Sequence, residues 1–288
     1  MTHKRRKIKI LLIGANGQLG RDLEAAFGSD EIIPLTHNDI EITDYEHARD
    51  VIVEYQPDMV INTAAYHNVP ECEKNPERAF LVNSVGSKNL SDICHQNRIG
   101  LAYISSDYVF DGKKNSPYNE EDVPNPLNAY SISKLAGEFF TRKVKKHYVV
   151  RVASLFGKGG CRAKGGRNFV TTMLNHAKTK DRIQVTANVI CSPTYTKDAA
   201  MKIKELLQEG YPSGIYHAAN SGHCSWYEFA LEIFSQANIK TNVERKIEGE
   251  EEGGVRKPLY SPLISEKTKP LRHWKEALES YLKEEEII

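Results

Sequence analysis

A short apolar run followed by a glycine-spaced turn constrains the fold of this chain more than any other feature. Residues Ile8–Ile13 read IKILLI, and Gly14, Gly17 and Gly20 follow with the spacing G-x-x-G-x-x-G. Such glycines permit a tight turn, an approach of backbone to phosphate, and close packing of a helix on a sheet. The N-terminus of that helix would present free N–H groups to an anion. The segment predicts a dinucleotide-binding unit, although an unliganded strand–helix turn can use the same glycines.

Strand-like and helix-like segments alternate through the first two-thirds of the chain. The expected strands are short and rich in Val and Ile: Ile8–Ile13, Ile32–Leu35, Met59–Asn62, Gly100–Ser105 and Tyr148–Val152. The helical patterns between them cover Gly20–Phe27, Tyr45–Tyr55, Pro76–Gln96 and Tyr130–Lys145. This alternation predicts an α/β fold with a doubly wound parallel sheet of the Rossmann type.

The last third of the chain has a different pattern. Further helices are expected at Asn168–Thr179, Trp226–Ala237 and Trp274–Lys283, and strands at Ile183–Val185 and Gly214–His217. Residues 158–167 are basic and rich in glycine, which predicts a flexible loop. We expect residues 1–155 with 183–222 to form the dinucleotide-binding domain. Residues 156–182 with 223–288 would form a smaller C-terminal substrate-binding cap over the carboxyl ends of the strands.

Composition and charge exclude several classes of function. The 288 residues include 39 Lys and Arg against 38 Asp and Glu, so no overall field attracts nucleic acid or an anionic membrane. No apolar run approaches the roughly 20 residues of a membrane-spanning helix, and residues 1–7 lack the apolar stretch of a signal peptide. Without C-x-x-C or H-E-x-x-H spacing, we expect reduced thiols, a cytoplasmic protein and no metal ligands. Mg²⁺ stays open as a cofactor but has no support in the sequence.

Tyr130 and Lys134 are the strongest candidates for acid–base chemistry. They are four residues apart, so on a helix they share one face. A tyrosine with its ordinary pKa of ~10 is a poor acid at neutral pH, but a nearby ammonium lowers that pKa. Ser106 ends an expected strand and is suited to polarise a carbonyl. Taken alone, Tyr130 and Lys134 also suit a solvated helix face, with Ser106 capping a turn. Their combination with Ser106 and the glycine turn favours the catalytic interpretation.

The end of the second expected strand bears on the choice of cofactor. NAD-preferring sites usually carry an acidic residue there, and this chain has Thr36 and His37 instead. Both side chains are suited to donate to a 2′-phosphate, which favours NADPH. Asp39 or Glu41 can still reach the ribose, so NADH stays open.

Longer motifs resemble the extended short-chain dehydrogenase/reductase family over nearly the whole chain. They include SSDYVFDG at 105–112 and PLNAYSISKLAGE at 126–138. The resemblance implies NADPH-dependent reduction of the C4 ketone of dTDP-4-dehydro-L-rhamnose to dTDP-L-rhamnose, the last step of dTDP-rhamnose biosynthesis. It also implies that Ser106, Tyr130 and Lys134 are catalytic. Reduction or epimerisation of another nucleotide sugar stays open, as do a non-catalytic regulatory subunit with this fold and a homodimer.

We expect two further groups of site residues. Contacts to the cofactor are expected from Gly14, Asn16, Gly17, Gln18, Leu19, Thr36, His37, Glu41, Ile42, Ala64, Ala65, Tyr66, His67, Tyr130 and Lys134. Contacts to the nucleotide sugar are expected from Ser106, Asp107, Ser154, Arg162 and Arg167. The two arginines lie in the glycine-rich loop and are suited to meet the diphosphate.

The chain departs from the pattern of the resembling family at a few positions. The family often has Asp-Arg at Thr36-His37, and it commonly has a tryptophan, used against the sugar, at Ser154. It also has an acidic residue at Pro70, and a Gln and a Gly at Val189 and Cys191. The departures at Pro70, at Ser154 and in the later loop bear on the identity of the sugar, and the one at Thr36 bears on the choice of cofactor. Trp226, which opens an amphipathic helix, is expected in the core.

Overall fold

A six-stranded parallel sheet forms the centre of the computed structural model, which describes residues 8–28, 31–160, 165–249 and 251–288. The strands are β1 (Lys9–Ile13), β2 (Glu31–Leu35), β3 (Met59–Asn62), β4 (Gly100–Ser106), β5 (His147–Val152) and β10 (Gly214–His217). Their order is β10–β5–β4–β3–β1–β2, and every neighbouring pair is parallel. The strand order reverses between β1 and β3, which confirms the predicted doubly wound fold.

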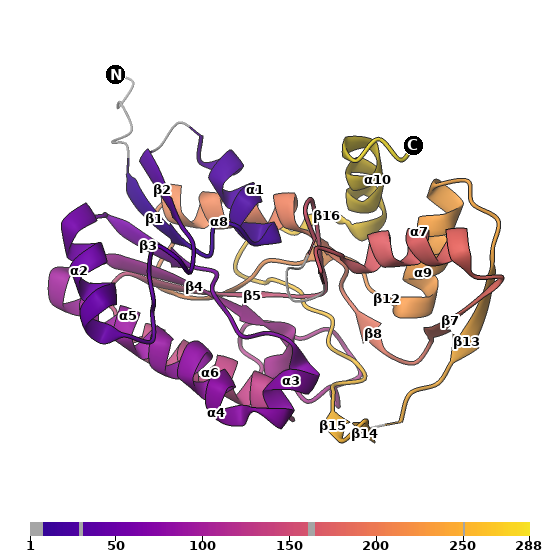
Figure 1. Cartoon of the computed structure of the whole chain (residues 1–288), viewed down its shortest axis with the longest axis horizontal. Coiled ribbons are helices and arrows are strands. Elements are labelled where there is room, and N and C mark those ends of the chain that lie inside the picture. The colour runs from indigo at the N-terminus through magenta and orange to yellow at the C-terminus, as the bar shows by residue number, and fades with distance from the viewer. Residues whose placement is uncertain (1–7, 29–30, 161–164, 250) are drawn as a thin grey trace.

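Helices cover both faces of this sheet (Figure 1). They are α1 (Gln18–Ala26) and α8 (Thr196–Gln208) on one face, and α2 (Tyr45–Tyr55), α5 (Gly86–Asn97) and α6 (Ala129–Thr141) on the other. Successive side chains of a strand point to opposite faces. Leu12 of β1 therefore packs in one cluster with Leu23 and Ile203. Its neighbour Leu11 packs with Ile52 on the other face. We call the sheet with these helices the sheet half.

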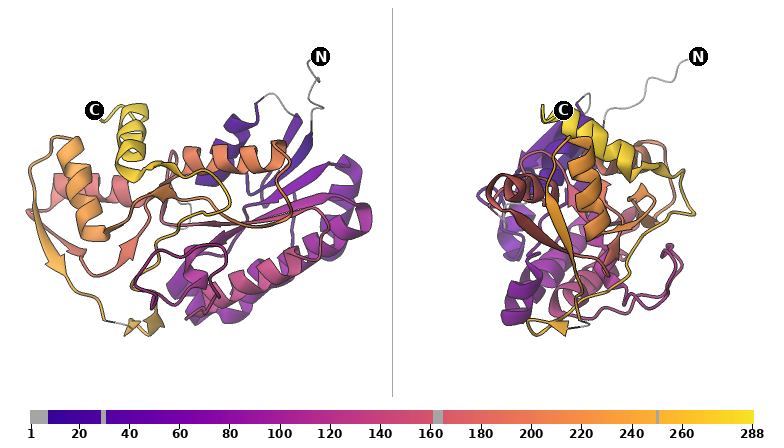
Figure 2. Two further views of the ribbon diagram at one scale, coloured as in Figure 1. Left: turned by 180° about the vertical axis from the view of Figure 1, so that it is seen from behind. Right: turned by 90° about the vertical axis from the view of Figure 1, so that its right-hand side faces the viewer.

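A second core lies beside the sheet half, on the right of Figure 1. We call it the cap; its elements are α7 (Phe169–Thr179), β7 (Arg182–Thr186), α9 (Trp226–Gln236), β13 (Asn242–Lys246) and α10 (Trp274–Glu284). The rings of Phe156, Phe229 and Trp274 meet inside it, with centroids 5.6 Å apart in successive pairs. In the left view of Figure 2 the cap lies at one end of the molecule, and in the right view it faces the viewer.

The strand expected at 183–185 is present but pairs away from the central sheet. β7 pairs with β13 in parallel, and Ile183 and Val185 pack in the core of the cap. Arg182 and Gln184, which alternate with these apolar positions, are exposed, as in a strand that buries one face only. β7 therefore lies with the cap. The predicted assignment of residues 183–222 as a whole to the dinucleotide-binding domain stays a prediction.

The remaining elements are short. They are α3 (Val69–Lys74), α4 (Pro76–Phe80), η1 (Leu81–Val85), η2 (Asp107–Val109), β6 (Leu155–Phe156), β8 (Ile190–Cys191), β9 (Thr194–Tyr195), β11 (Asn220–Ser221), β12 (Cys224–Ser225), β14 (Glu251–Glu252), β15 (Val255–Arg256) and β16 (Leu271–His273). Within the described part of the chain, no helix has both the length and the apolar character needed to span a bilayer.

The predicted helix Pro76–Gln96 divides into α4, the wider π-helical turn η1, and α5. Wide turns of this kind often occur at functional sites. Here the wide turn carries Asn83, whose amide binds both backbone groups of Tyr66. The Tyr66 N–H donates to Asn83 Oδ1 at 2.9 Å, and Asn83 Nδ2 donates to the Tyr66 carbonyl at 2.9 Å. The interruption of the helix therefore fixes the segment that follows β3.

Candidate active site

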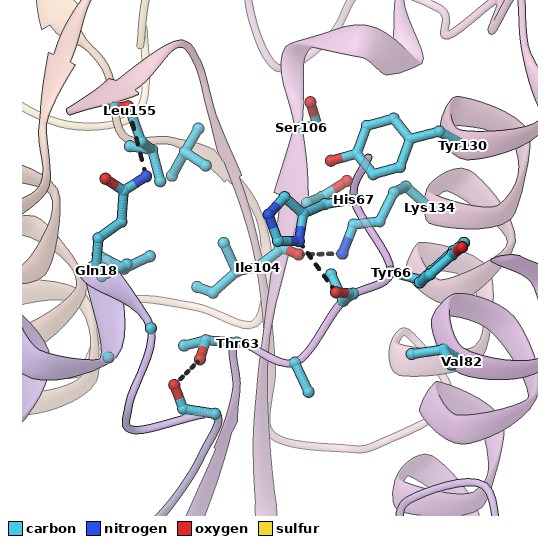
Figure 3. Close-up of a pocket in the computed structure, with 18 of the residues that line it drawn as sticks. Gln18, Thr63, Tyr66, His67, Val82, Ile104, Ser106, Tyr130, Lys134 and Leu155 are labelled. Atoms are coloured by element: carbon cyan, nitrogen blue, oxygen red, sulfur yellow. Dashed lines mark hydrogen bonds between the residues drawn. The ribbon is translucent and has the colours of Figure 1, made fainter. Parts of the chain in front are cut away.

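A cavity of about 640 Å³ lies where the carboxyl ends of the central strands face the cap. Figure 3 shows part of its lining. The predicted site residues that line it are Gly14, Asn16, Gly17, Gln18, Leu19, His37, Glu41, Ile42, Ala64, Ala65, Tyr66, His67, Ser106, Asp107, Tyr130, Lys134, Ser154 and Arg167. Thr36 does not line it, and Arg162 lies outside the described residues. Segments far apart in sequence thus meet at one site.

The glycine turn forms one wall of the cavity. Gly14 has φ +83°, and a Cβ atom there would lie 2.5 Å from Thr63 Oγ1. Thr63 Oγ1 in turn donates to the Ile13 carbonyl at 2.8 Å, so β3 is held against this turn. Gly17 precedes α1 and makes no side-chain cap bond, which leaves the first N–H groups of that helix without a capping side chain. This geometry fits the diphosphate of a dinucleotide.

The end of β2 differs from the expectation for Thr36. Its hydroxyl donates to Asp39 Oδ2 at 2.7 Å and its N–H donates to the same oxygen at 2.8 Å. The expected role of Thr36 as a donor to the cofactor therefore has no support in this geometry. His37 does line the cavity, 3.4 Å from the Glu41 carboxylate, and Arg78 lines it too. Sequence reasoning missed Arg78, because nothing about the short helix α4 marks it.

The Glu41 carboxylate is the acidic group at this end of the cavity. Burial raises its pKa, but hydrogen bonds from the N–H and hydroxyl of Thr43 outweigh that effect and hold the pKa below its ordinary value. His37 and Arg78 act on the pKa in the same direction. Glu41 is therefore ionised at neutral pH with two cationic or potentially cationic side chains nearby.

Tyr130 and Lys134 lie on α6 and face the end of β4, as predicted. Asn128 caps this helix, with its side chain accepting from the Ser131 N–H at 3.0 Å. Lys134 is buried, and its Nζ donates to the Ile104 carbonyl at 2.6 Å. Burial lowers the pKa of Lys134 to about 7. In Figure 3 the Tyr130 ring lies above Lys134, and Ser106 lies at the end of its strand beside the ring.

The acidity expected for Tyr130 is not a property of the protein alone. Burial raises the pKa of Tyr130, and the hydrogen bond to Ser106 opposes that effect only in part. Lys134, which was expected to lower this pKa, is directed to a backbone carbonyl and lies 4.0 Å from the ring centroid of Tyr103. The phenol is therefore neutral and holds its proton in the free protein.

The cap contributes an aromatic wall that sequence reasoning missed. Trp226, expected in the core, is half-buried and lines the cavity together with Phe169. Their ring centroids are 4.6 Å apart. Ser154, with φ +43°, lines the same cavity from the sheet half. The signal available in the sequence was Ser225, which caps α9 and places Trp226 at the first position of that helix.

Comparisons with known proteins agree with this geometry. The model of a family described as the RmlD substrate binding domain matches residues 8–287. The chain belongs to this family. The resemblance expected from the sequence motifs is thereby confirmed.

Individual relatives cover nearly all of the chain. It is 40% identical over 285 residues to the spore coat polysaccharide biosynthesis protein SpsK of Bacillus subtilis (strain 168), covering 96% of this chain and 97% of that protein. It is 36% identical over 281 residues to a dTDP-4-dehydrorhamnose reductase of Mycolicibacterium smegmatis, covering 94% and 84%. A crystal structure of dTDP-4-dehydrorhamnose reductase from Bacillus anthracis str. Ames in complex with NADP superposes with a TM-score of 0.90 and 35% identity. That superposition covers 96% of this chain and 99% of the other.

A metal centre has no geometric basis in the described residues. Within 8–28, 31–160, 165–249 and 251–288, no three His, Cys, Asp or Glu side chains gather as metal ligands. The cysteines Cys72, Cys94, Cys191 and Cys224 are buried free thiols.

Proposed function

We propose that this protein is a reductase that converts dTDP-4-dehydro-L-rhamnose to dTDP-L-rhamnose with NADPH. The observation that carries the proposal is the arrangement of Ser106, Tyr130 and Lys134 around one cavity. The glycine turn forms one wall of that cavity, and an aromatic pair from the cap forms another. The names of the relatives support the same sugar chemistry.

Tyr130 is the proposed proton donor for the C4 oxygen. Bound NADPH supplies the hydride to C4. Since the phenol is neutral in the free protein, it holds the proton that the developing alkoxide needs. Lys134 donates to the Ile104 carbonyl in the free protein. Its ammonium is proposed to turn toward the phenol during this transfer, where its charge lowers the pKa of the phenol and stabilises the phenolate left behind. Ser106 is placed to hold the carbonyl oxygen through its hydroxyl.

The proposed preference for NADPH rests on the end of β2. Thr36 occupies the place of the usual acidic residue, and His37 and Arg78 line the cavity near Glu41. Thr36 does not itself line the cavity, but it directly precedes His37, which does. Thr36→Asp adds a carboxylate at this end of β2, so we expect the preference to shift toward NADH by at least about tenfold. Dissociation constants of both cofactors, measured for the wild type and the variant, test this. A strong preference of the wild type for NADH contradicts the assignment.

The aromatic pair is the proposed replacement for a missing tryptophan. Ser154 is too small to form an aromatic wall where the family commonly has tryptophan. Trp226 and Phe169 line the same cavity from the cap and present ring surface to it. Apolar ring surface against a 6-deoxy sugar restores the wall from the opposite side. A nucleotide sugar can therefore be held against an aromatic wall although position 154 is a serine.

A panel of nucleotide 4-ketosugars tests the function directly. Purified protein is mixed with NADPH and each sugar, and loss of NADPH absorbance is recorded. We expect the fastest oxidation with dTDP-4-dehydro-L-rhamnose. Faster reduction of another nucleotide sugar moves the assignment to that sugar, and isomer formation without NADPH loss indicates an epimerase. Absence of turnover with every sugar indicates a non-catalytic subunit.

A further inference from the structure

A hydrogen-bonded chain links the C-terminal part of the molecule to the proposed active site. Ser261 Oγ donates to Asp107 Oδ2 at 2.6 Å, across 154 positions of sequence. Ser106 Oγ donates to the other oxygen, Asp107 Oδ1, at 2.9 Å. Ser106 and Tyr130 both line the cavity beside this chain of bonds. Ser106, Asp107 and Ser261 are all buried, and the first two also line the cavity.

The backbone around Ser261 fixes the position of its hydroxyl. The Ser261 N–H donates to the Ile190 carbonyl at 3.0 Å, and the Ile190 N–H donates to the Leu259 carbonyl at 2.8 Å. Two residues later, the Leu263 N–H donates to Ser192 Oγ at 3.2 Å. This local pairing fixes the backbone of Ser261, from which the hydroxyl donates to one carboxylate oxygen of Asp107.

The Ser106 hydroxyl has one hydrogen, and two acceptors compete for it: Asp107 Oδ1 and the carbonyl oxygen of a bound substrate. While Asp107 is ionised, that hydrogen points to Asp107 Oδ1, and Ser106 Oγ accepts from the Tyr108 N–H at 3.2 Å. In this state Ser106 has no hydrogen to offer a substrate carbonyl. Because Ser261 donates to Oδ2, a proton on the carboxyl group sits on Oδ1, facing Ser106. Asp107 then donates to Ser106, whose own hydrogen is free to turn.

We propose that Asp107 and Ser261 are positioning residues that decide whether the Ser106 hydroxyl donates to Asp107 or to the substrate. Neutral Asp107 donates to Ser106 and so turns the Ser106 hydroxyl toward the carbonyl oxygen of the substrate. Ionised Asp107 draws that hydrogen away. Ser261 selects Oδ1 as the oxygen that carries the proton. The inference rests on the proposed function, which it extends with a pH dependence.

The surroundings of Asp107 place its titration in a useful range. Burial raises the pKa of Asp107 to about 6, and the bond from Ser261 is the first of the interactions that oppose the increase. Reduction should therefore decline as the pH rises through this pKa, because the ionised form withdraws the Ser106 hydrogen. Loss of the Ser261 hydroxyl should move the decline to higher pH, since the ionised form loses a donor.

Other titratable groups face Asp107 from the neighbouring elements. They are Tyr108 on η2, Tyr130 on α6 and Cys191 on β8. Burial raises the pKa of each, so all three are neutral where Asp107 titrates. Lys134, with a pKa lowered to about 7, titrates in the same window and also contributes to a pH profile. A variant at Ser261 distinguishes the contributions of Asp107 and Lys134 to the pH profile. Ser261 donates to Asp107, whereas Lys134 donates to the Ile104 carbonyl.

The first test is the pH profile of kcat/KM for ketosugar reduction in Ser261→Ala. We expect its alkaline decline to move upward by about one pH unit relative to wild type, as loss of one hydrogen bond to a charged group implies. Ser265→Ala is the matched control, because Ser265 Oγ donates at 2.5 Å to a different carboxylate, Glu120 Oε1. The control profile should match wild type. An unshifted profile in Ser261→Ala overturns the inference.

The second test needs no turnover. The Asp carboxyl carbons are labelled with ¹³C in the full chain, the Asp107 signal is assigned by its loss in Asp107→Asn, and it is titrated by NMR. We expect a midpoint near 6 in wild type and a higher one in Ser261→Ala. An ordinary midpoint near ~4 in wild type overturns the inference. Failure of the proposed function is distinct, since it shows as no ketosugar reduction by wild type at any pH.

Discussion

The sheet half and the cap reach the same cavity by different routes. In the sheet half, consecutive strands and helices deliver Ser106, Tyr130 and Lys134 from β4 and the next helix, α6. In the cap, Phe169 and Trp226 come from α7 and α9, which are separated in sequence by α8 and β10 of the sheet half. The sheet half therefore carries the groups that move protons, and the cap carries ring surface. This difference predicts that substitutions in the two parts affect different kinetic constants.

The two parts also hold their side chains differently. Lys134 is fixed by a hydrogen bond to the backbone of the strand beside it, and burial shifts its pKa. The cap aromatics are fixed by ring contacts, with Phe169 stacked on Phe229 at 5.4 Å and tilted against Trp226. A hydrogen-bonded group tolerates little change, whereas a packed ring surface tolerates shape-conserving changes better.

The largest expected effect is that of Tyr130→Phe in the sheet half. It removes only a hydroxyl, so the fold should persist while turnover falls by at least about 100-fold. Stopped-flow or steady-state rates with NADPH and ketosugar measure the loss. Tyr45→Phe removes a hydroxyl on α2 that donates to Gln96 at 3.2 Å, and Tyr45 does not line the cavity, so this control should leave the rates unchanged. Near-normal turnover of Tyr130→Phe excludes it as the proton donor.

Lys134→Met should have the next largest effect. It removes the ammonium proposed to act on Tyr130, while keeping a flexible apolar stem in the buried site. We expect at least about a tenfold loss in both turnover and cofactor affinity. Lys88→Met, at an exposed lysine on α5, is the control. Lost turnover with unchanged cofactor affinity would limit Lys134 to its effect on the pKa of the phenol.

The smallest effect belongs to the cap. Trp226→Ala removes half of the aromatic wall, and we expect KM for the ketosugar to rise about fivefold, with a smaller change in kcat. Tyr227→Ala is the matched control, because Tyr227 is the next residue on α9 but packs with Arg245 at 4.9 Å. A drop in kcat with unchanged KM would place Trp226 among the groups that act in the chemical step and would break the division between the two parts.

The sheet half was largely predictable from sequence, and particular residues show why. The apolar runs of β1, β3 and β4 end at Gly14, Thr63 and Ser106, so strand ends mark functional positions directly. The helix α8 was not predicted, although Ala199, Ile203 and Leu206 have helical spacing and are buried on the sheet. Its polar positions diluted the apolar pattern.

The cap residues were harder to predict because their roles depend on long-range packing. Trp226 has the same sequence pattern whether its ring enters the core or a cavity. The bond between Ser261 and Asp107 joins a loop to a strand end across most of the chain, and no local spacing encodes it. Thr36 shows a third reason, since its hydroxyl binds Asp39 three residues away and not a ligand.

The most direct test of the proposed reduction follows the hydride that passes from NADPH to C4 of the sugar. The protein is incubated with dTDP-4-dehydro-L-rhamnose and NADPH that carries deuterium at both positions of nicotinamide C4, and the sugar product is analysed by mass spectrometry and NMR. The account predicts dTDP-L-rhamnose with one deuterium on C4. Recovery of the unchanged ketosugar, or a product with no deuterium on C4, would contradict it.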